Sequence, residues 1–474
     1  MNITPTTGTI SSAGIGSGLD VNDIITKLMA TEQKPLVNLQ TAASAMQTKL
    51  SAFGQMQSYV SALQDAATSL FSSTTYTATK TSSSNTSSVN ASSSATAMAG
   101  TYSVSVSALS APQSIVSATG QFTDGSSPVG TGSITIQLAK TGSTAITIPI
   151  GASDNTLAAI RDKINAATTG VTATLVTDVS GTRIALQSSA PGLDNAFTVT
   201  VAEDAGSPGL ARLAYDPVVA TSPMLLAQSA ANAQAKVNGI DVSSSNNTLA
   251  GVVDGMTFTL SQVTTTPVSV SVTSDTDSIK AQLTNFVASY NQLNSFIAAT
   301  TKYDPTTKTA ALLQGDSTTV GIQNQLQSLL GQTSGASSAF RTLSSIGLQI
   351  QKDGTLELDD ATVTAALANL PELTKAMSNV DLTNPSNNGF AKKFSAWTTN
   401  LLASNGTLPG KAASIQRQIA SNQKDQDAMN ARLEQIQARM QAQYTALDST
   451  MAKANALSAY VTQQIATWNK QKDY

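Results

Sequence analysis

The sequence predicts an α+β multidomain protein. Terminal coiled-coil helices enclose a mostly helical domain, which we call the leg, and the leg encloses β-rich domains, which we call the head. Three observations predict this nested fold. Apolar residues repeat every seven positions at both ends, they alternate with polar residues through the middle, and a helical period returns after residue 276. With 474 residues, of which 41% are hydrophobic, we expect two to four domains.

The N-terminal helix is expected to begin at Asp20, a good N-cap, with Asp23 as a second carboxylate in its positively polarised first turn. Two interleaved heptad series then run to about Phe71, which is typical of a coiled coil. Pro35 lies inside the pattern, so we expect a break between residues 31 and 34. The seam residues expected to contact another subunit or the filament are Ile25, Met29, Leu36, Leu39, Met46, Leu50, Phe53 and Val60.

The C-terminal end carries a second heptad stripe, from Ile415 to Trp468, which as a helix would span about 80 Å. Gln426 interrupts its first series, and the second series shifts by one residue at Tyr444, which indicates a local change of supercoil. The corresponding seam residues, with the same expected contacts, are Ile419, Leu433, Ile436, Met440, Leu447, Met451, Val461 and Ile465.

These two stripes admit two interpretations, which can hold together. In the first, both ends of the chain pack on each other as a long antiparallel hairpin within one monomer. In the second, both ends stay poorly ordered in the isolated chain and become helical when subunits assemble, because amphipathic helices take most of their stability from packing. The sequence leaves both interpretations open.

The middle of the chain has the period of two that predicts strands. Residues 72–100 are almost wholly Ser, Thr, Ala and Asn, so we expect a linker or an irregular extended segment there. A short helix capped near Asp154 is expected among the strands, which form two modules, one inserted into the other. The expected strands lie at residues 102–106, 134–138, 146–150, 171–176, 183–187, 197–201, 236–242, 256–260 and 268–272.

The helical period returns from Asp277, and Asp353-Gly354 predicts a β-hairpin. Further helices are expected at 360–369, 371–378 and 390–402. The expected domains are an N-terminal coiled-coil segment at 1–76 that pairs with a C-terminal one at 406–474, a leg at 77–100 and 274–405, a head domain at 101–120 and 214–273, and a head domain inserted at 121–213.

The composition argues against most functional classes. Charged residues make up only 12% of the chain, the net charge is -3 and no basic cluster is present, so we expect no nucleic-acid partner. There is no cysteine and no histidine, which removes the commonest metal ligands and general bases, so we expect neither a cofactor nor an enzyme. Lacking a basic and apolar N-terminal signal and any long apolar run, the chain is expected to have no Sec signal and no membrane insertion.

Three groups of residues resemble ligand sites, and each has a structural explanation. The glycines between residues 14 and 18 lack the buried strand that precedes a dinucleotide loop, so we expect a flexible entry to the first helix. The acidic residues at 275–277 and 357–360 lack calcium-loop spacing, and we expect them to cap the helices that follow. The aromatic residues at 390–397 recur at helical spacing and predict core packing.

Several segments carry a family resemblance. Residues 14–36 read G-I-G-S-G-L-D-V-N-D-I-I-T-K-L-M-A-T-E-Q-K-P-L, and residues 155–192 contain N-T-L-A-A-I-R-D-K-I-N, V-T-A-T-L and R-I-A-L-Q-S. Later segments read V-N-G-I-D-V, G-V-V-D-G-M-T-F-T-L, F-V-A-S-Y-N-Q-L and G-L-Q-I-Q-K-D-G-T-L-E-L-D-D. In this order they resemble the N-terminal signature, the IN motif shared with flagellins, and the C-terminal half of the flagellar hook-associated protein 2 family.

The resemblance implies a non-enzymatic cap at the distal tip of the growing flagellar filament. Such a protein is secreted through the flagellar type III apparatus, forms a homo-oligomeric ring of about five subunits, retains exported flagellin and promotes its folding and polymerisation. The implied partners are further copies of the chain, flagellin and an export chaperone. The alternatives are a hook-filament junction or flagellin-like subunit, and a surface adhesin that acts through the β-rich head.

Overall fold

The computed structural model describes residues 20–219 and 221–471. The glycines at 14–18 and the N-terminal segment judged to lack a Sec signal lie outside the described residues. The chain divides into two compact units. The first, which we call the helical unit, combines the residues before Ser73 with those from Lys280 onward, and the second, the β unit, is Ser73–Ile279. The predicted α+β multidomain fold is confirmed.

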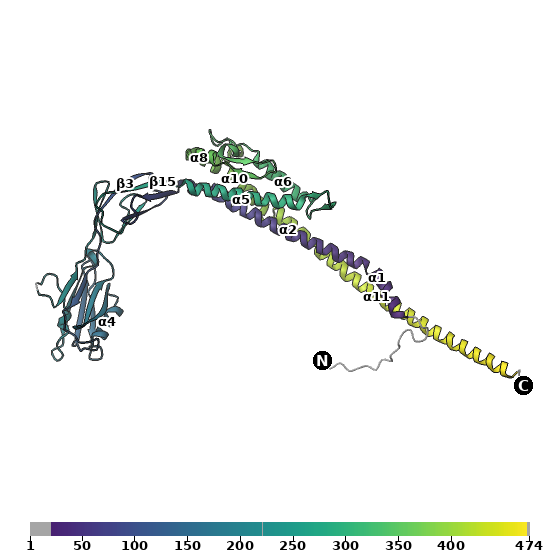
Figure 1. Cartoon of the computed structure of the whole chain (residues 1–474), viewed down its shortest axis with the longest axis horizontal. Helices are drawn as coiled ribbons and strands as arrows, with labels where there is room; N and C mark the ends of the chain where they lie inside the picture. Colours follow the sequence, from purple (N-terminus) through teal and green to yellow (C-terminus); the bar gives the residue numbers. More distant parts are fainter. Residues whose placement is uncertain (1–19, 220, 472–474) are drawn as a thin grey trace. The chain divides into compact units, whose positions relative to one another are not determined.

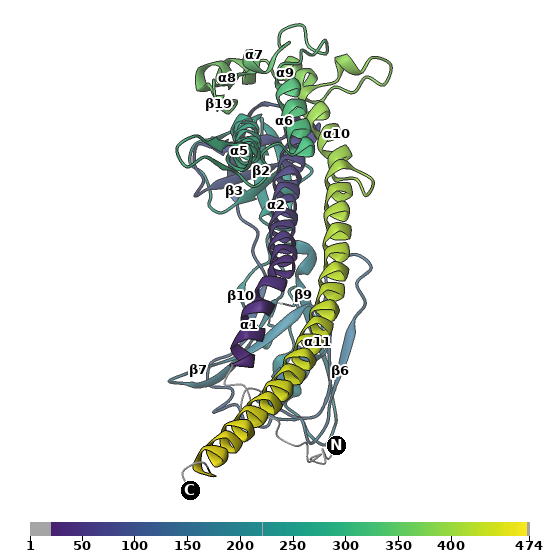
Figure 2. The ribbon, with the colours of Figure 1, turned by 90° about the vertical axis from the view of Figure 1, so that its right-hand side faces the viewer.

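Three long helices form the terminal part of the helical unit. α1 (Val21–Glu32) begins at the predicted N-cap, where Asp20 Oδ1 accepts a hydrogen bond from the third helical N–H at 3.0 Å. α2 (Lys34–Phe71) follows after one residue, with Pro35 in its first turn, so the predicted break is confirmed. α11 (Thr407–Gln471) has 65 residues and lies beside α2, as both views show (Figures 1 and 2).

The remaining helices pack around a core in which α5 (Thr276–Thr301) meets α10 (Phe390–Leu402). Phe286 on α5 and Phe394 on α10 are buried edge to face, with ring centroids 5.1 Å apart. Tyr290 Oη donates to the Gly354 carbonyl at 2.9 Å, which fixes the predicted hairpin on α5. The other elements are β16 (Tyr303–Asp304), β17 (Thr309–Ala310), α6 (Ser317–Leu330), α7 (Leu343–Ile346), β18 (Leu348–Ile350), β19 (Leu356–Leu358), α8 (Asp360–Leu367), α9 (Leu370–Ser378) and η3 (Pro385–Asn387).

The β unit contains two modules, and the outer one is built from two antiparallel sheets. Their strand orders are β1-β15-β3-β11-β12 and β13-β14-β2. Alternate valines of β3 and β15 point inward and meet the buried Phe258 of β14, which gives the predicted period of two. The elements are α3 (Thr74–Thr77), β1 (Thr79–Ser83), β2 (Val89–Ser93), β3 (Gly100–Ala108), β11 (Ala233–Val237), β12 (Ile240–Ser244), β13 (Thr248–Ala250), β14 (Met256–Leu260) and β15 (Val268–Ser274).

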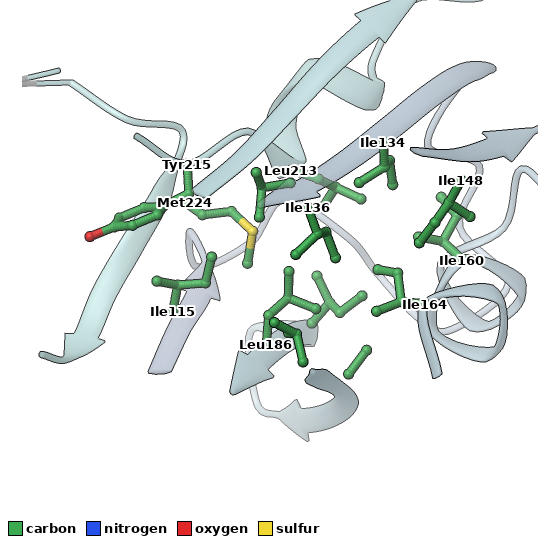
Figure 3. Close-up of a cluster of buried hydrophobic side chains, with 14 of the residues drawn as sticks. Ile115, Ile134, Ile136, Ile148, Ile160, Ile164, Leu186, Leu213, Tyr215 and Met224 are labelled. Carbon is green, nitrogen blue, oxygen red and sulfur yellow. The ribbon is translucent and has the colours of Figure 1, made fainter. Parts of the chain in front are cut away.

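The inserted module has its own core, which Figure 3 shows. Sheets of order β10-β4-β8-β7 and β6-β5-β9 contribute inward residues such as Ile134 and Leu186, and the α4 helix adds Ile160 and Ile164. The elements are β4 (Ser114–Ser117), β5 (Gly132–Leu138), β6 (Ile146–Ile150), α4 (Leu157–Ala166), β7 (Val171–Asp178), β8 (Gly181–Ser188), η1 (Leu193–Asn195), β9 (Phe197–Glu203), η2 (Leu210–Leu213) and β10 (Met224–Gln228).

The prediction of a linker or an irregular extended segment at 72–100, with 77–100 assigned to the leg, was wrong. β1 pairs with β15, β2 pairs with β14, and the stretch from Ser73 onward belongs to the β unit. Its hydroxyls replace apolar contacts, because Thr81 Oγ1 donates to the Ala91 carbonyl and Ser83 Oγ to the Val89 carbonyl, each at 2.6 Å. The single strand expected at 236–242 is likewise the hairpin of β11 and β12, turned at Asn238 and Gly239, which both have positive φ.

Candidate assembly interface

α1 and α11 close on each other through a small apolar cluster that we call the terminal clasp. Its five buried members are between 2 and 8% exposed, so each of them is already covered within its own chain. Burying one such side chain contributes about 1.5–3 kcal/mol, which favours the intramolecular hairpin. The buried members are Val21, Ile25, Met29, Leu433 and Ile436, and the partly buried ones are Leu36, Met429, Met440 and Tyr444.

Between the clasp and the start of α11 the predicted seam is only half closed. Asn422 stands at a seam position, 7% exposed, and its Oδ1 accepts a hydrogen bond from Gln426 Nε2 at 2.6 Å. A polar pair at such positions weakens packing and favours one register. This polar pair separates the terminal clasp from the rest of the helical unit. The predicted seam residues that are half-buried here are Leu39, Met46, Leu50 and Ile419.

Two predicted contact residues lie in the interior of the helical unit. Phe53 is 1% exposed and Val60 is 0% exposed. Lys411 Nζ lies 5.5 Å from the centroid of the Phe53 ring and covers it. Neither side chain offers a surface to a second chain in this structure, and their role as assembly contacts stays a prediction. Their heptad position reflects packing of α2 within its own unit.

The end of α11 differs from the rest of the helix. After Tyr444 it continues past α1 (Figure 1), and several large apolar side chains there stay open to solvent. Soluble proteins rarely expose an apolar row of this kind unless it is an interaction surface. Four of the residues were predicted as contacts, whereas Leu457, Tyr460 and Trp468 complete the surface. We call this set the α11 stripe: Leu447, Met451, Leu457, Tyr460, Val461, Ile465 and Trp468.

An ion pair anchors the opposite end of α11. Lys411 Nζ lies 2.6 Å from Asp316 Oδ2, and their side chains are 26% and 13% exposed. Asp316 Oδ1 also accepts from the Thr319 N–H at 3.0 Å, which caps α6. Burial raises the pKa of Asp316, but hydrogen bonds from Lys411 and the Thr319 N–H outweigh it, so the pKa lies below its usual value. The beginning of α11 is thereby held to α6.

The other sequence candidates are structural. Asp275 Oδ1 accepts from the Ser278 N–H and Asp359 Oδ1 from the Thr362 N–H, so both acidic groups cap helices as predicted. Within residues 20–219 and 221–471, no cluster of acidic residues could hold a metal ion. Trp397 is half-buried and donates its Nε1 proton to Gln325 Oε1 at 2.8 Å. No described helix is both long enough and apolar enough to cross a membrane.

Among the described residues, the far end of α11 leaves an apolar surface uncovered, which is typical of a protein that assembles with other chains. Comparison with known protein families identifies the family. The model of the flagellar hook-associated protein 2 N-terminus matches residues 17–113, that of its C-terminus matches 230–456, and the flagellin hook IN motif matches 133–190. The chain belongs to the flagellar hook-associated protein 2 family, as its motifs predicted.

The relatives match along almost the whole chain. Flagellar hook-associated protein 2 of Escherichia coli K12 is 31% identical over 465 residues, covering 96% of this chain and 98% of the relative. The Salmonella typhimurium protein of the same name is 32% identical over 477 residues, covering 97% and 99%. The crystal structure of the D1-D2-D3 domains of the E. coli flagellar cap protein FliD is 31% identical, with a TM-score of 0.62, and covers 77% of this chain and 99% of that one.

Proposed function

We propose that this protein caps the flagellar filament. Copies of the chain form an oligomeric cap at the distal tip, where they prevent the loss of exported flagellin and promote its folding and polymerisation. The observation that carries the proposal is the α11 stripe, an apolar surface on a family member that its own described residues leave uncovered. Family membership supplies the context in which such a surface contacts filament subunits or other copies of the chain.

The binding free energy that the stripe can provide suits a cap that must stay attached to the filament and yet move as the filament grows. Its seven side chains are between 38 and 69% exposed, so about half of each remains to be buried. At roughly 1 kcal/mol for each half-buried side chain, one helix would gain about 7 kcal/mol before the costs of ordering and association. One subunit then binds weakly, whereas several subunits linked in a ring bind firmly and can release one at a time.

The remaining details of the proposal rest on the resemblance. They are a ring of about five subunits, export through the flagellar type III apparatus with a dedicated chaperone, and a final location at the filament tip outside the cell. Whether the terminal helices are already folded before assembly is part of the same proposal. The terminal clasp supports a hairpin that exists before assembly, and the α11 stripe supports contacts that form only during it.

The test is a pair of substitutions in the full chain, Val461→Asp with Ile465→Asp, expressed in cells that lack the native cap protein. Both side chains are about half exposed, so the change leaves the fold intact while it charges the stripe. We expect flagellin to accumulate in the medium and filaments to be short. Ala459→Asp with Gln463→Asp adds the same charge at the same spacing, on exposed residues of the same helix outside the stripe, and is the matched control. Filaments of normal length with Val461→Asp and Ile465→Asp would refute the proposal.

A further inference from the structure

One flank of α11 carries a row of positive charges. Each member stands one position before a residue of the first heptad series of this helix, so all of them lie on one side of its apolar seam. Their side chains are exposed, and none of them forms an ion pair within residues 20–219 and 221–471. We call this set the cation row: Arg432, Arg439 and Lys453.

The opposite flank of α11 carries a row of acidic residues. Each member stands one position after a residue of the same heptad series, so the seam lies between the two rows. Asp427 and Glu434 are exposed, and Asp427 Oδ1 accepts a hydrogen bond from Gln423 Nε2 of the same helix at 3.0 Å. We call this set the acid row: Asp427, Glu434 and Asp448.

The two rows have the same spacing. Each has a charge in two successive heptads, an uncharged residue in the third, Ala446 or Gln441, and a charge in the fourth. The cation row is shifted by five residues toward the C-terminus, which is about 7.5 Å along the helix axis. A second α11 that lies parallel to the first with this displacement would bring every cation beside an acid at once. Asp425, one heptad before Arg432, marks the N-terminal limit of the cation row.

The rows cannot satisfy each other within one helix. Solvated helices pair opposite charges three or four positions apart, and no member of one row stands at that distance from a member of the other. A nucleic acid fits the cation row poorly, because cations about 10 Å apart are much sparser than phosphates at about 1.7 Å. The complementary surface that the structure does offer is the acid row of another copy.

We propose that the cation row of one chain faces the acid row of a second copy, so that neighbouring α11 helices lie parallel and side by side in the cap. This inference rests on the proposed function, because it names the neighbour of each α11 in the oligomer. A contact between opposite flanks is heterologous and can close into a ring. An antiparallel two-fold pair would instead set each row against its own copy, and like charges repel. The α11 stripe supplies apolar contact area, and the rows fix which flank of the neighbour each helix meets.

Sedimentation velocity of the full chain at about 50 mM and about 500 mM salt tests the proposal, because salt screens exposed charge pairs. Self-association of the unmodified chain should weaken as the salt concentration rises. Arg432→Glu with Arg439→Glu should weaken it about tenfold at low salt, since two attractive pairs become two repulsive ones. Asp427→Lys with Glu434→Lys should weaken it by a similar factor. All four residues are exposed, so the fold stays intact.

The matched control is Arg417→Glu with Lys424→Glu. These two cations are also exposed, lie on the same helix and are seven residues apart, but each stands two positions before the heptad series and so points away from the seam. Reversing them makes the same change in net charge as reversing Arg432 and Arg439. We expect self-association to stay within about twofold of the unmodified chain, because exposed charges outside a contact contribute little.

Two further samples distinguish a broken contact from a misfolded chain. The first is an equimolar mixture of the two reversal variants, and the second is the fourfold variant that carries both reversals. Each of them again sets cations against acids, so association should return to within about threefold of the unmodified chain. Failure of both samples to recover would overturn the proposal.

The proposal would also be overturned by an unmodified chain that stays monomeric at low salt, by reversal variants that associate normally, or by equal weakening in the control. Capping is judged separately, by the retention of flagellin in cells that lack the native cap protein. Reversal variants that associate normally and retain flagellin would remove the charge rows and leave capping in place. An unmodified chain that associates through its rows, yet lets flagellin escape, would support the rows and refute capping.

Discussion

The ion pair between Lys411 and Asp316 allows the anchoring of α11 to be measured directly. Lys411→Met keeps an unbranched side chain over the Phe53 ring and removes the charge, whereas Asp316→Asn keeps an efficient N-cap for α6 and removes the carboxylate. Together with the double variant, these two substitutions form a thermodynamic cycle that isolates the coupling of the pair.

The magnitude follows from the geometry. The pair is 2.6 Å apart and its side chains are only 26% and 13% exposed, so it behaves as a charge-assisted hydrogen bond rather than a surface ion pair. Such bonds contribute about 1.5–3 kcal/mol, and this is the coupling we expect. Lys411→Met alone should cost about 2 kcal/mol and lower the melting temperature of the helical unit by roughly 4–8 °C.

The assay is urea denaturation of the full chain, followed by the fluorescence of Trp397, whose Nε1 bonds to Gln325 on α6. A Trp468→Phe background removes the exposed second tryptophan. Because the Asp316 pKa is lowered in the native state, the coupling is fully present above the usual carboxyl pKa of about 3.9 and disappears as the pH falls through the lowered value. A coupling below about 0.5 kcal/mol at pH 7, the level of surface pairs, would refute this account of the anchor.

Three further predictions concern the helical unit. Phe53→Ala should cost about 3–5 kcal/mol in urea denaturation because its buried ring is lost, while Val461→Ala on the exposed stripe should cost less than ~0.5 kcal/mol; equal costs would contradict the distinction drawn between them. Gly347→Ala should destabilise the unit by more than ~1 kcal/mol, since Gly347 has φ of 99° and an added Cβ would lie 2.6 Å from a Val363 methyl group; an unchanged melting temperature would count against it. Hydrogen bonds from Lys375 and the loop at 337–338 lower the pKa of Glu372 to about 2, so the protection of the loop amides, taken relative to the intrinsic exchange rate at each pH, should fall as the pH drops from about 4.5 towards 2. Glu372→Gln should remove this pH dependence of the protection, and an identical acid profile in the variant would exclude Glu372 as the cause.

The terminal helices could be predicted because their signal is local. Heptads, the Asp20 cap and Pro35 all act within a few residues, and they placed α1, α2 and α11 correctly. The heptad pattern could not distinguish Val60, which is buried, from Val461, which is exposed, because both occupy apolar heptad positions. Whether such a residue is buried depends on whether α5 and α10 lie beside it, and that is decided by residues more than two hundred positions away in the chain.

The strands at 79–93 carried no usable sequence signal. β1 and β2 satisfy their pleated faces with hydroxyl-to-carbonyl hydrogen bonds, so the apolar alternation that predicts strands is missing.

The central claim is that the α11 stripe, and not the interior heptads, carries the contacts of assembly. A chain without cysteine makes this directly measurable, because a single introduced thiol is the only labelling site. Val461→Cys and the matched Gln463→Cys would each carry a benzophenone photocrosslinker in caps on growing filaments. The account predicts crosslinks to flagellin or to a second copy of the chain from position 461 and few from position 463. Equal yields from both positions, or none from position 461, would contradict it.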